Sequence, residues 1–378
     1  MKKNKDNTIN KRLDYVDYAK GIGILLVVLG HTKMVVDESD TTAYFFIKLI
    51  YTFHMPLFFV ITGLLLGIRG QKLEKAKQKA KLNIGKLFVR LMIPYYIWSV
   101  IYMIVEYLQN GNENGKIQDM IRATIITNGN APLWFLAALF FARLIFHFLK
   151  EVMELDEKEI LAGSLFLSFF ASRLYDLMTK KGLLEQQIPR FITIAVFRLF
   201  PSVFFLAFGY FLSRQLNKKD KKYGCVAGIL LLFCLMITVE LYYPGINMHI
   251  FQLRDMPYFL LTGCTGSTAV LLLCRCLPDN IKALRELGQD SMDIMALHYK
   301  PMTFMFIAGD LVKNITGKMN FILVWLVCCV MVVPLALLLK YIKKETAAAV
   351  LKIKAKKLEK QKKEEAEKSA DNTAEAEN

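Results

Sequence analysis

The composition of the chain excludes most classes of soluble protein. Of its 378 residues 54% are hydrophobic, and yet the formal net charge is +16. A soluble domain of this composition would expose a large apolar surface, whereas lipid solvates such a surface directly. The cations lie in short clusters between long apolar runs, which is typical of loops that flank membrane spans rather than of a nucleic-acid-binding surface. We therefore expect an integral membrane protein that does not bind nucleic acid.

Apolar runs of the length that a bilayer requires recur along the whole sequence. A transmembrane helix needs about 20 mostly apolar residues. We therefore predict an all-α polytopic membrane protein with about ten transmembrane helices and no internal repeat. Their boundaries, within a few residues, are 15–36, 44–69, 88–109, 132–150, 159–178, 191–213, 223–243, 257–277, 291–312 and 320–342.

The distribution of lysine and arginine predicts the orientation of these spans. With a cytoplasmic N-terminus, the inside segments contain the dense basic clusters, such as 72–86 and 214–222, and the outside loops contain only scattered cations. The positive-inside rule therefore places both termini in the cytoplasm. We expect a basic N-terminus over 1–14, a transmembrane domain over 15–342, and a charged tail over 343–378. The tail is predicted to be disordered or a solvated helix, and its lysine-rich beginning suits anionic lipid head groups.

The first predicted span holds the densest group of ionisable residues, and charges at membrane depth mark candidate sites. Lys20 and His31 are eleven positions apart, so they share a helix face at an axial separation of about 16 Å. Gly23 and Gly30 also lie near one face, where another helix or a ligand can approach. The alternatives are a snorkelling Lys20 paired with Asp17 and a neutral His31 bonded to a neighbouring helix. The alignment of the pair favours a functional interpretation.

The second predicted span places His54 where it would approach His31 if the two spans pack together. The alternative is a polar group associated with a kink, because Pro56 frees backbone carbonyls nearby. Several weaker candidates lie in other spans, many near span ends where snorkelling suffices: Glu106, Arg143, His147, Arg173, Asp176, Arg198, Glu240, Asp293 and His298. No cysteine or histidine cluster has ligand spacing, so we expect neither a metal site nor a disulfide framework.

Five strings carry a resemblance to a known family. They are YVDYAKGIGILLVVLGH, FHMPLFFVITGLLLG, APLWFLAALF, FFLAFGYFL and LGQDSMDIMALH, in this order. From about Leu13 to about Tyr341 the chain resembles the integral-membrane acyltransferases, which include the fucose 4-O-acetylase-like and surface-polysaccharide O-acetyltransferase proteins. The family hallmark is a basic residue, ten intervening residues and a histidine, which here are Lys20 and His31. The commoner residue at the basic position is Arg, a planar fork, whereas Lys is a point charge.

The resemblance implies an O-acyltransferase, with acetyl as the usual group, in a bacterial inner or plasma membrane. It implies transfer from cytoplasmic acyl-CoA, such as acetyl-CoA, to a hydroxyl of an extracytoplasmic envelope glycan or related surface molecule. No tightly bound cofactor is expected. The partners are acyl-CoA, the glycan acceptor and membrane lipids, and self-association into a homo-oligomer is left open. The implied catalytic residues are His31 and Lys20, and the implied substrate-binding residues are Asp17, His54, Trp134 and His298. Arg198 is a further substrate-binding candidate, from its position just before the segment FPSVFFLAFGY, where it can face a polar cavity.

In a mechanism consistent with these residues, the two ends of the first span have different roles. Lys20 would hold the phosphates of the donor, whose thin arm would run along the glycine-lined face to His31. His31 would act either as general base on the acceptor hydroxyl or as a nucleophile that carries the acyl group. The rival functions are a transporter or exporter of polysaccharide or lipid-linked glycan, which the lack of a repeat disfavours, and a non-enzymatic scaffold or sensor.

Overall fold

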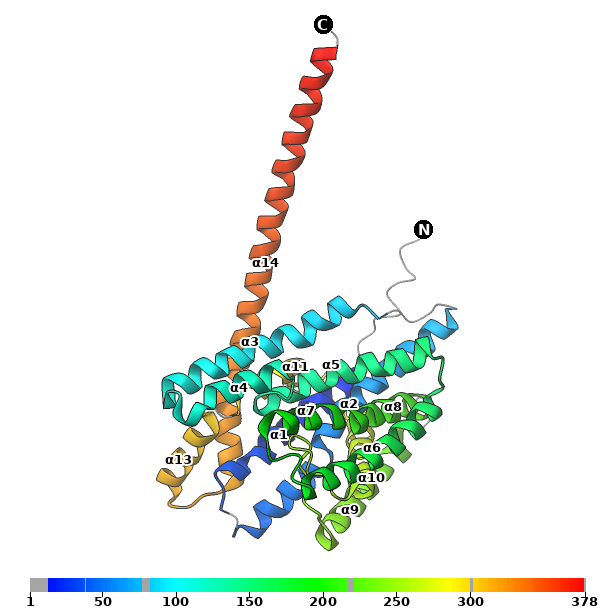
Figure 1. Ribbon diagram of the computed structural model, residues 1–378, viewed down its shortest axis with the longest axis vertical. Coiled ribbons are helices and arrows are strands. Elements are labelled where there is room, and N and C mark those ends of the chain that lie inside the picture. Colours follow the sequence, from blue (N-terminus) through cyan, green and yellow to red (C-terminus); the bar gives the residue numbers. More distant parts are fainter. Residues whose placement is uncertain (1–12, 38, 77–81, 217–220, 300–301, 377–378) are drawn as a thin grey trace. The chain divides into compact units, whose positions relative to one another are not determined.

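The computed structural model describes residues 13–37, 39–76, 82–216, 221–299 and 302–376. Within these residues the chain is helical, with one isolated β-bridge between Asn247 and Gln252 and no strand (Figure 1). The chain divides into two compact units, Met1–Val332 and Val333–Asn378. The all-α class predicted from the sequence is confirmed.

The first half of the chain contains six α-helices. They are α1 (Asp14–His31), α2 (Thr41–Lys75), α3 (Ile84–Asn110), α4 (Lys116–Ile125), α5 (Trp134–His147) and α6 (Glu157–Lys180). Short helical turns join them: η1 (Thr32–Met34), η2 (Glu113–Gly115), η3 (Ala131–Leu133) and the π-helical turn η4 (Phe148–Val152). The second half has α7 (Gln187–Phe197), α8 (Leu199–Leu216), α9 (Lys221–Leu241), α10 (Met256–Cys276), α11 (Lys282–Gln289), α12 (Ser291–Leu297), α13 (Phe304–Thr316) and α14 (Phe321–Ala376).

Seven stretches of the described chain are long and apolar enough to cross a membrane, so the predicted number of ten is not confirmed. They are α2, α3, α6, α7 with α8, α9, α10 and the part of α14 up to Ala349. Helix α1 has only 18 residues and includes Asp14, Asp17 and Lys20, and α5 has only 14 residues. The predicted boundary between transmembrane domain and tail, at 342/343, lies inside α14.

The predicted span 291–312 is wrong as a single helix. It divides into α12, which ends at Leu297, and α13, which begins at Phe304. The sequence of this window contains Pro301, and proline disfavours helical backbone at the residue before it and cannot donate a backbone hydrogen bond. The break leaves carbonyls of α12 without helical donors, and the Tyr102 hydroxyl donates to the Ala296 carbonyl at 2.5 Å.

Helix α2 lies at the centre of the first unit and packs against α1, α8 and α10. Glycines allow the closest of these contacts. A Cβ at Gly63 would overlap the Leu206 carbonyl of α8, and a Cβ at Gly209 would overlap the Val60 carbonyl of α2. The two backbones therefore touch, which is how helices associate where lipid offers no hydrophobic driving force.

The glycine face of α1 is occupied by α2. Added Cβ atoms at Gly23 would lie 3.1 Å from Leu57 and Phe58, and at Gly30 3.1 Å from Ile50. Of the two uses predicted for this face, approach of another helix is confirmed. The side chains of α2 thus lie against this face, and the route of a donor arm stays a prediction. The next section describes a cavity elsewhere on α1.

Candidate active site

A cavity of about 330 Å³ lies beside α1. Helices α1, α2, α3, α5 and α12 line it, together with the loop between α9 and α10. Lys20 and His31 both line it, which confirms that they face the same way. His54 lines it as well, so the predicted packing of the first two spans brings these two histidines to one cavity.

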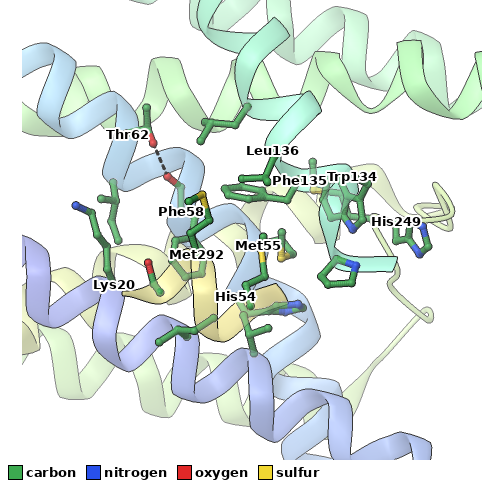
Figure 2. Close-up of a pocket in the computed structure, with 18 of the residues that line it drawn as sticks. Lys20, His54, Met55, Phe58, Thr62, Trp134, Phe135, Leu136, His249 and Met292 are labelled. Atoms are coloured by element: carbon green, nitrogen blue, oxygen red, sulfur yellow. Dashed lines mark hydrogen bonds between the residues drawn. The ribbon is translucent and has the colours of Figure 1, made fainter. Parts of the chain in front are cut away.

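The two ends of the cavity differ in chemistry. Figure 2 shows Lys20 and Thr62 on one side and Trp134 and His249 on the other, with Met292 between them. The first end is polar and basic, and the second combines aromatic rings with imidazoles. Lys20 and His31 lie on α1 at these two ends, and about 16 Å of helix separates them.

His31 forms a hydrogen-bonded pair with His298, the residue at the break after α12. The Nδ1 of His298 lies 3.0 Å from the Ile294 carbonyl, and its Nε2 lies 2.9 Å from the Nδ1 of His31. A carbonyl only accepts, so Nδ1 of His298 carries a hydrogen and its Nε2, when the ring is neutral, accepts from Nδ1–H of His31. The Val27 carbonyl also accepts from His31. The contact with His298 uses Nδ1 of His31 and leaves Nε2 of the neutral ring with its lone pair available as a base.

Aromatic rings and a second imidazole surround His31. Tyr299 packs edge-on at 4.8 Å between ring centroids, and Tyr51 lies 6.4 Å away. His54 is 5.1 Å beyond Tyr51, and its Nδ1 donates to the Ile50 carbonyl at 2.8 Å. Pro56 leaves the carbonyl of Thr52 without its helical hydrogen bond. The alternative interpretation of His54 required a bond to such a freed carbonyl, and His54 does not make it.

Arg198 contacts the residues of the aromatic end from the side that faces away from the cavity. It is fully buried between α7 and α8, with Nη2 donating to both the backbone and the side-chain oxygen of Asn128 at 2.9 and 2.7 Å, and Nη1 to the His249 carbonyl at 3.3 Å. Its guanidinium lies 4.9 Å over the ring of Trp134. Arg198 does not line the cavity, so it contacts the cavity wall rather than the cavity itself.

Trp134 and His249 form a stacked pair at this end. Their ring centroids are 6.2 Å apart with an interplanar angle of 12°. Burial, and then the positive charge of Arg198, lower the pKa of His249 to about 4, so the ring is neutral at pH 7. Gly129 has a φ of +82°, and a Cβ there would overlap the Trp134 backbone, so the loop before α5 requires glycine.

Lys20 and Asp17 form a short-range ion pair at the basic end. Lys20 Nζ lies 3.4 Å from Asp17 Oδ1, with the carboxylate buried and the lysine partly exposed. Asp17 does not line the cavity. The Asp17 carboxylate thus holds the Lys20 ammonium close to α1, at the wall of the cavity.

The cavity contains residues that the sequence analysis did not select: Thr62, Tyr51, Arg90, His249 and Tyr299. A signal existed for Tyr299, which follows His298, and for Tyr51, which is one turn before His54. Arg90 looked like an ordinary charge at a span boundary. His249 had no signal, because only the tertiary structure brings its loop to α5.

The described lining of the cavity contains no Asp, Glu or Cys side chain. The imidazole bases of this lining are those of His31, His54 and His249. An anionic ligand meets no like charge in this lining, and it meets the cations Lys20 and Arg90. The cavity thus suits an anionic molecule that reacts beside an imidazole.

Comparison with known proteins assigns the sequence to a family. Residues 13–341 match the acyltransferase domain family. The chain belongs to this acyltransferase family. With several helices long and apolar enough to cross a membrane, it is a multi-pass membrane protein of this family.

The chain is similar to three curated proteins over parts of their lengths. It is 38% identical over 95 residues to the nodulation protein NolL of Sinorhizobium fredii, covering 24% of this chain and 25% of that protein. For NolL of Mesorhizobium japonicum the values are 35% over 97 residues, or 25% and 24% of the two chains. An amino-acid racemase of Enterococcus faecalis is 24% identical over 279 residues, which are 70% of this chain and 36% of the racemase. The chain thus matches about a quarter of the length of each NolL protein. No solved structure matches.

Proposed function

We propose that the protein is a membrane O-acyltransferase that moves an acyl group, with acetyl as the expected one, from cytoplasmic acyl-CoA to a hydroxyl of an extracytoplasmic glycan or related surface molecule in a bacterial cell envelope. The observation that carries the proposal is the His31–His298 pair at one end of a cavity whose other end is basic. Membership of the acyltransferase family supports the reaction class.

The donor is expected to enter from the basic end. With both termini in the cytoplasm, as the positive-inside rule predicts, the Lys20 end of α1 faces the cytoplasm and the His31 end faces outward. Lys20 and Arg90 attract the charged part of acyl-CoA. The thioester then reaches His31 along a wall of Ile24, Val27 and Phe58, which is apolar as a pantetheine arm requires.

The chemical step uses Nε2 of His31. It removes the proton from the acceptor hydroxyl while the oxygen attacks the thioester carbonyl carbon, so that a C–O bond forms and the C–S bond breaks. His31, now protonated, donates a stronger hydrogen bond to His298. The proton then passes to the departing thiolate, which leaves as free CoA. The alternative that His31 carries the acyl group uses the same atom, and a trapped acyl-imidazole would identify it.

The acceptor is expected at the aromatic end. Trp134 and Tyr51 offer ring surface and Asn247 offers an amide, a combination that suits a molecule with both apolar faces and hydroxyl groups. Arg198 supports this end by holding Asn128 and the His249 loop, so its role in acceptor binding is indirect.

The decisive experiment compares the wild-type protein with His31→Ala in lipid nanodiscs, using labelled acetyl-CoA and a candidate envelope glycan. Thr238→Ala, at a partly exposed position on α9 that does not line the cavity, is the matched control. We expect acetyl transfer by the wild type and the control and its loss in His31→Ala. Normal transfer by a folded His31→Ala protein would contradict the proposed chemistry. Absence of acyl-CoA binding and turnover in the wild type, with glycan uptake into vesicles, would favour the rival function of an exporter.

A further inference from the structure

A second, smaller hollow of about 70 Å³ lies apart from the cavity, between α2, α5, η4 and α8. Three cations line it, Arg69, Arg143 and Lys150, with a single carboxylate, Glu151. We refer to it as the basic hollow. Arg69 is seven residues beyond Thr62 along α2, so the basic hollow begins about 10 Å past the basic end of the cavity, in the direction of Lys75.

The charges of the basic hollow are only partly balanced. Lys150 pairs with Glu157 at 3.4 Å, and Glu157 also pairs with Arg214, so that carboxylate is already shared between two cations. Among the described residues, Arg69 and Arg143 have no ion-pair partner within 4.0 Å. The basic hollow therefore carries an excess of positive charge, which an anionic ligand would balance.

Arg143 is the most exceptional of these cations. Its Nε is shielded from solvent and has no hydrogen-bond partner in the part of the chain that the structure describes. The charges of Arg90 and Arg69 both act on it. A sheltered guanidinium with an unpaired N–H beside two like charges is costly, and an anion that accepts from it removes much of that cost.

We propose that Arg69 and Arg143 bind a phosphate group. Arginine suits this task because its planar fork donates two parallel hydrogen bonds to phosphate oxygens. Arg90 links the two sites, since it lines the cavity and acts on Arg143. The phosphate is therefore that of the acyl donor, whose thioester lies in the cavity, and this assignment rests on the proposed function. The other source of the same chemistry is a phospholipid head group.

The test compares two thioesters with the full-length protein in nanodiscs. Acetyl-CoA and acetylpantetheine carry the same reactive group, but acetylpantetheine lacks the phosphates. We expect the wild type to bind acetyl-CoA about tenfold to hundredfold more tightly, the range of one or two charge-assisted contacts. Arg69→Gln and Arg143→Gln are each expected to reduce this ratio by about tenfold. Arg173→Gln, an exposed cation on α6, is the control and retains the wild-type ratio.

A second arm distinguishes the two sources of phosphate. Melting temperatures are measured in phosphatidylcholine nanodiscs with and without phosphatidylglycerol. If the arginine variants keep the thioester ratio but lose stabilisation by the anionic lipid, the site holds a lipid phosphate. If both responses equal those of Arg173→Gln, the proposal is overturned. If Arg143→Gln does not fold, Arg143→Lys and Arg69→Gln, the latter at an exposed position, replace it in both measurements.

The same experiment separates this proposal from the proposed function. A wild-type protein that binds neither thioester would contradict acyl-CoA as donor, and the lipid arm would still decide whether the arginines bind phosphate. A wild type that binds and turns over acetyl-CoA, with arginine variants indistinguishable from the control in both arms, would leave the function intact and remove the phosphate site.

Discussion

Replacing His298 by leucine removes the acceptor for Nδ1–H of His31 and leaves the rest of the cavity in place, because His298 is not part of the lining. His298 is fully buried, so no water replaces the lost acceptor directly. The hydrogen bond between His31 and the Val27 carbonyl does not involve His298 and remains in the variant. The variant therefore loses the stabilisation that His298 gives to the protonated form of His31.

The size of the effect follows from the hydrogen bond that is removed. Hydrogen bonds to charged groups contribute about 1.5–3 kcal/mol, roughly twice as much as neutral ones. His298 meets a charged partner only after His31 has taken the proton, so the bond stabilises the transition state more than the bound substrates. We therefore expect kcat to fall about tenfold to hundredfold in His298→Leu while KM for the donor changes little.

The assay is steady-state acetyl transfer in nanodiscs, with the donor and the acceptor varied separately. His298→Gln is the conservative variant, because the Gln side-chain oxygen also accepts, and we expect it to recover part of the lost kcat. A structural role alone would lower activity and melting temperature together and would give no selective rescue by Gln. A His298→Leu protein with kcat within about twofold of the wild type would refute the reasoning.

Four further changes test the surroundings of the site. Arg198→Lys loses the planar fork that holds Asn128, so KM for the acceptor should rise about tenfold with KM for the donor unchanged; equal changes in both would contradict a role confined to the aromatic end. Gly129→Ala places a Cβ on the Trp134 backbone and should abolish stable expression, and wild-type yield would argue against it. Tyr102→Phe loses the bond to the Ala296 carbonyl and should destabilise the protein by about 1 kcal/mol in thermal unfolding. Because the pKa of His249 is lowered to about 4 in the folded protein, the unfolded chain binds more protons as pH falls from 6.5 toward 4; stability should therefore decline over that window, and less steeply in His249→Gln, as melting temperatures would show.

Position along the chain was enough to predict the alignment of Lys20 with His31. Both lie on one helix, whose 3.6-residue period is a local property, and the structure places both on one cavity wall. The approach of His54 needed one additional assumption, that consecutive helices pack together, and this is the commonest arrangement. Helical class and multi-pass character also follow from apolar run lengths.

The partner of His31 could not be predicted in the same way. His298 is 267 residues away, and its position depends on the break between α12 and α13, which the apolar pattern of window 291–312 concealed. The cavity wall at His249 depends on a loop between two helices, held by Arg198 from a third place in the chain. Hydropathy measures the cost of placing a residue in lipid and carries no information about which distant side chains satisfy it.

The amino-acid sequence by itself determined the helical membrane architecture, the face that Lys20 and His31 share, and the family resemblance of residues 13–341, because each depends on local periodicity or on residue order. Only the tertiary structure decided that α2 fills the glycine face, that His298 accepts from His31, and that Arg69 and Arg143 gather at one hollow. These contacts join residues from separate helices, and their geometry is set by packing between helices rather than by the pattern within any one of them.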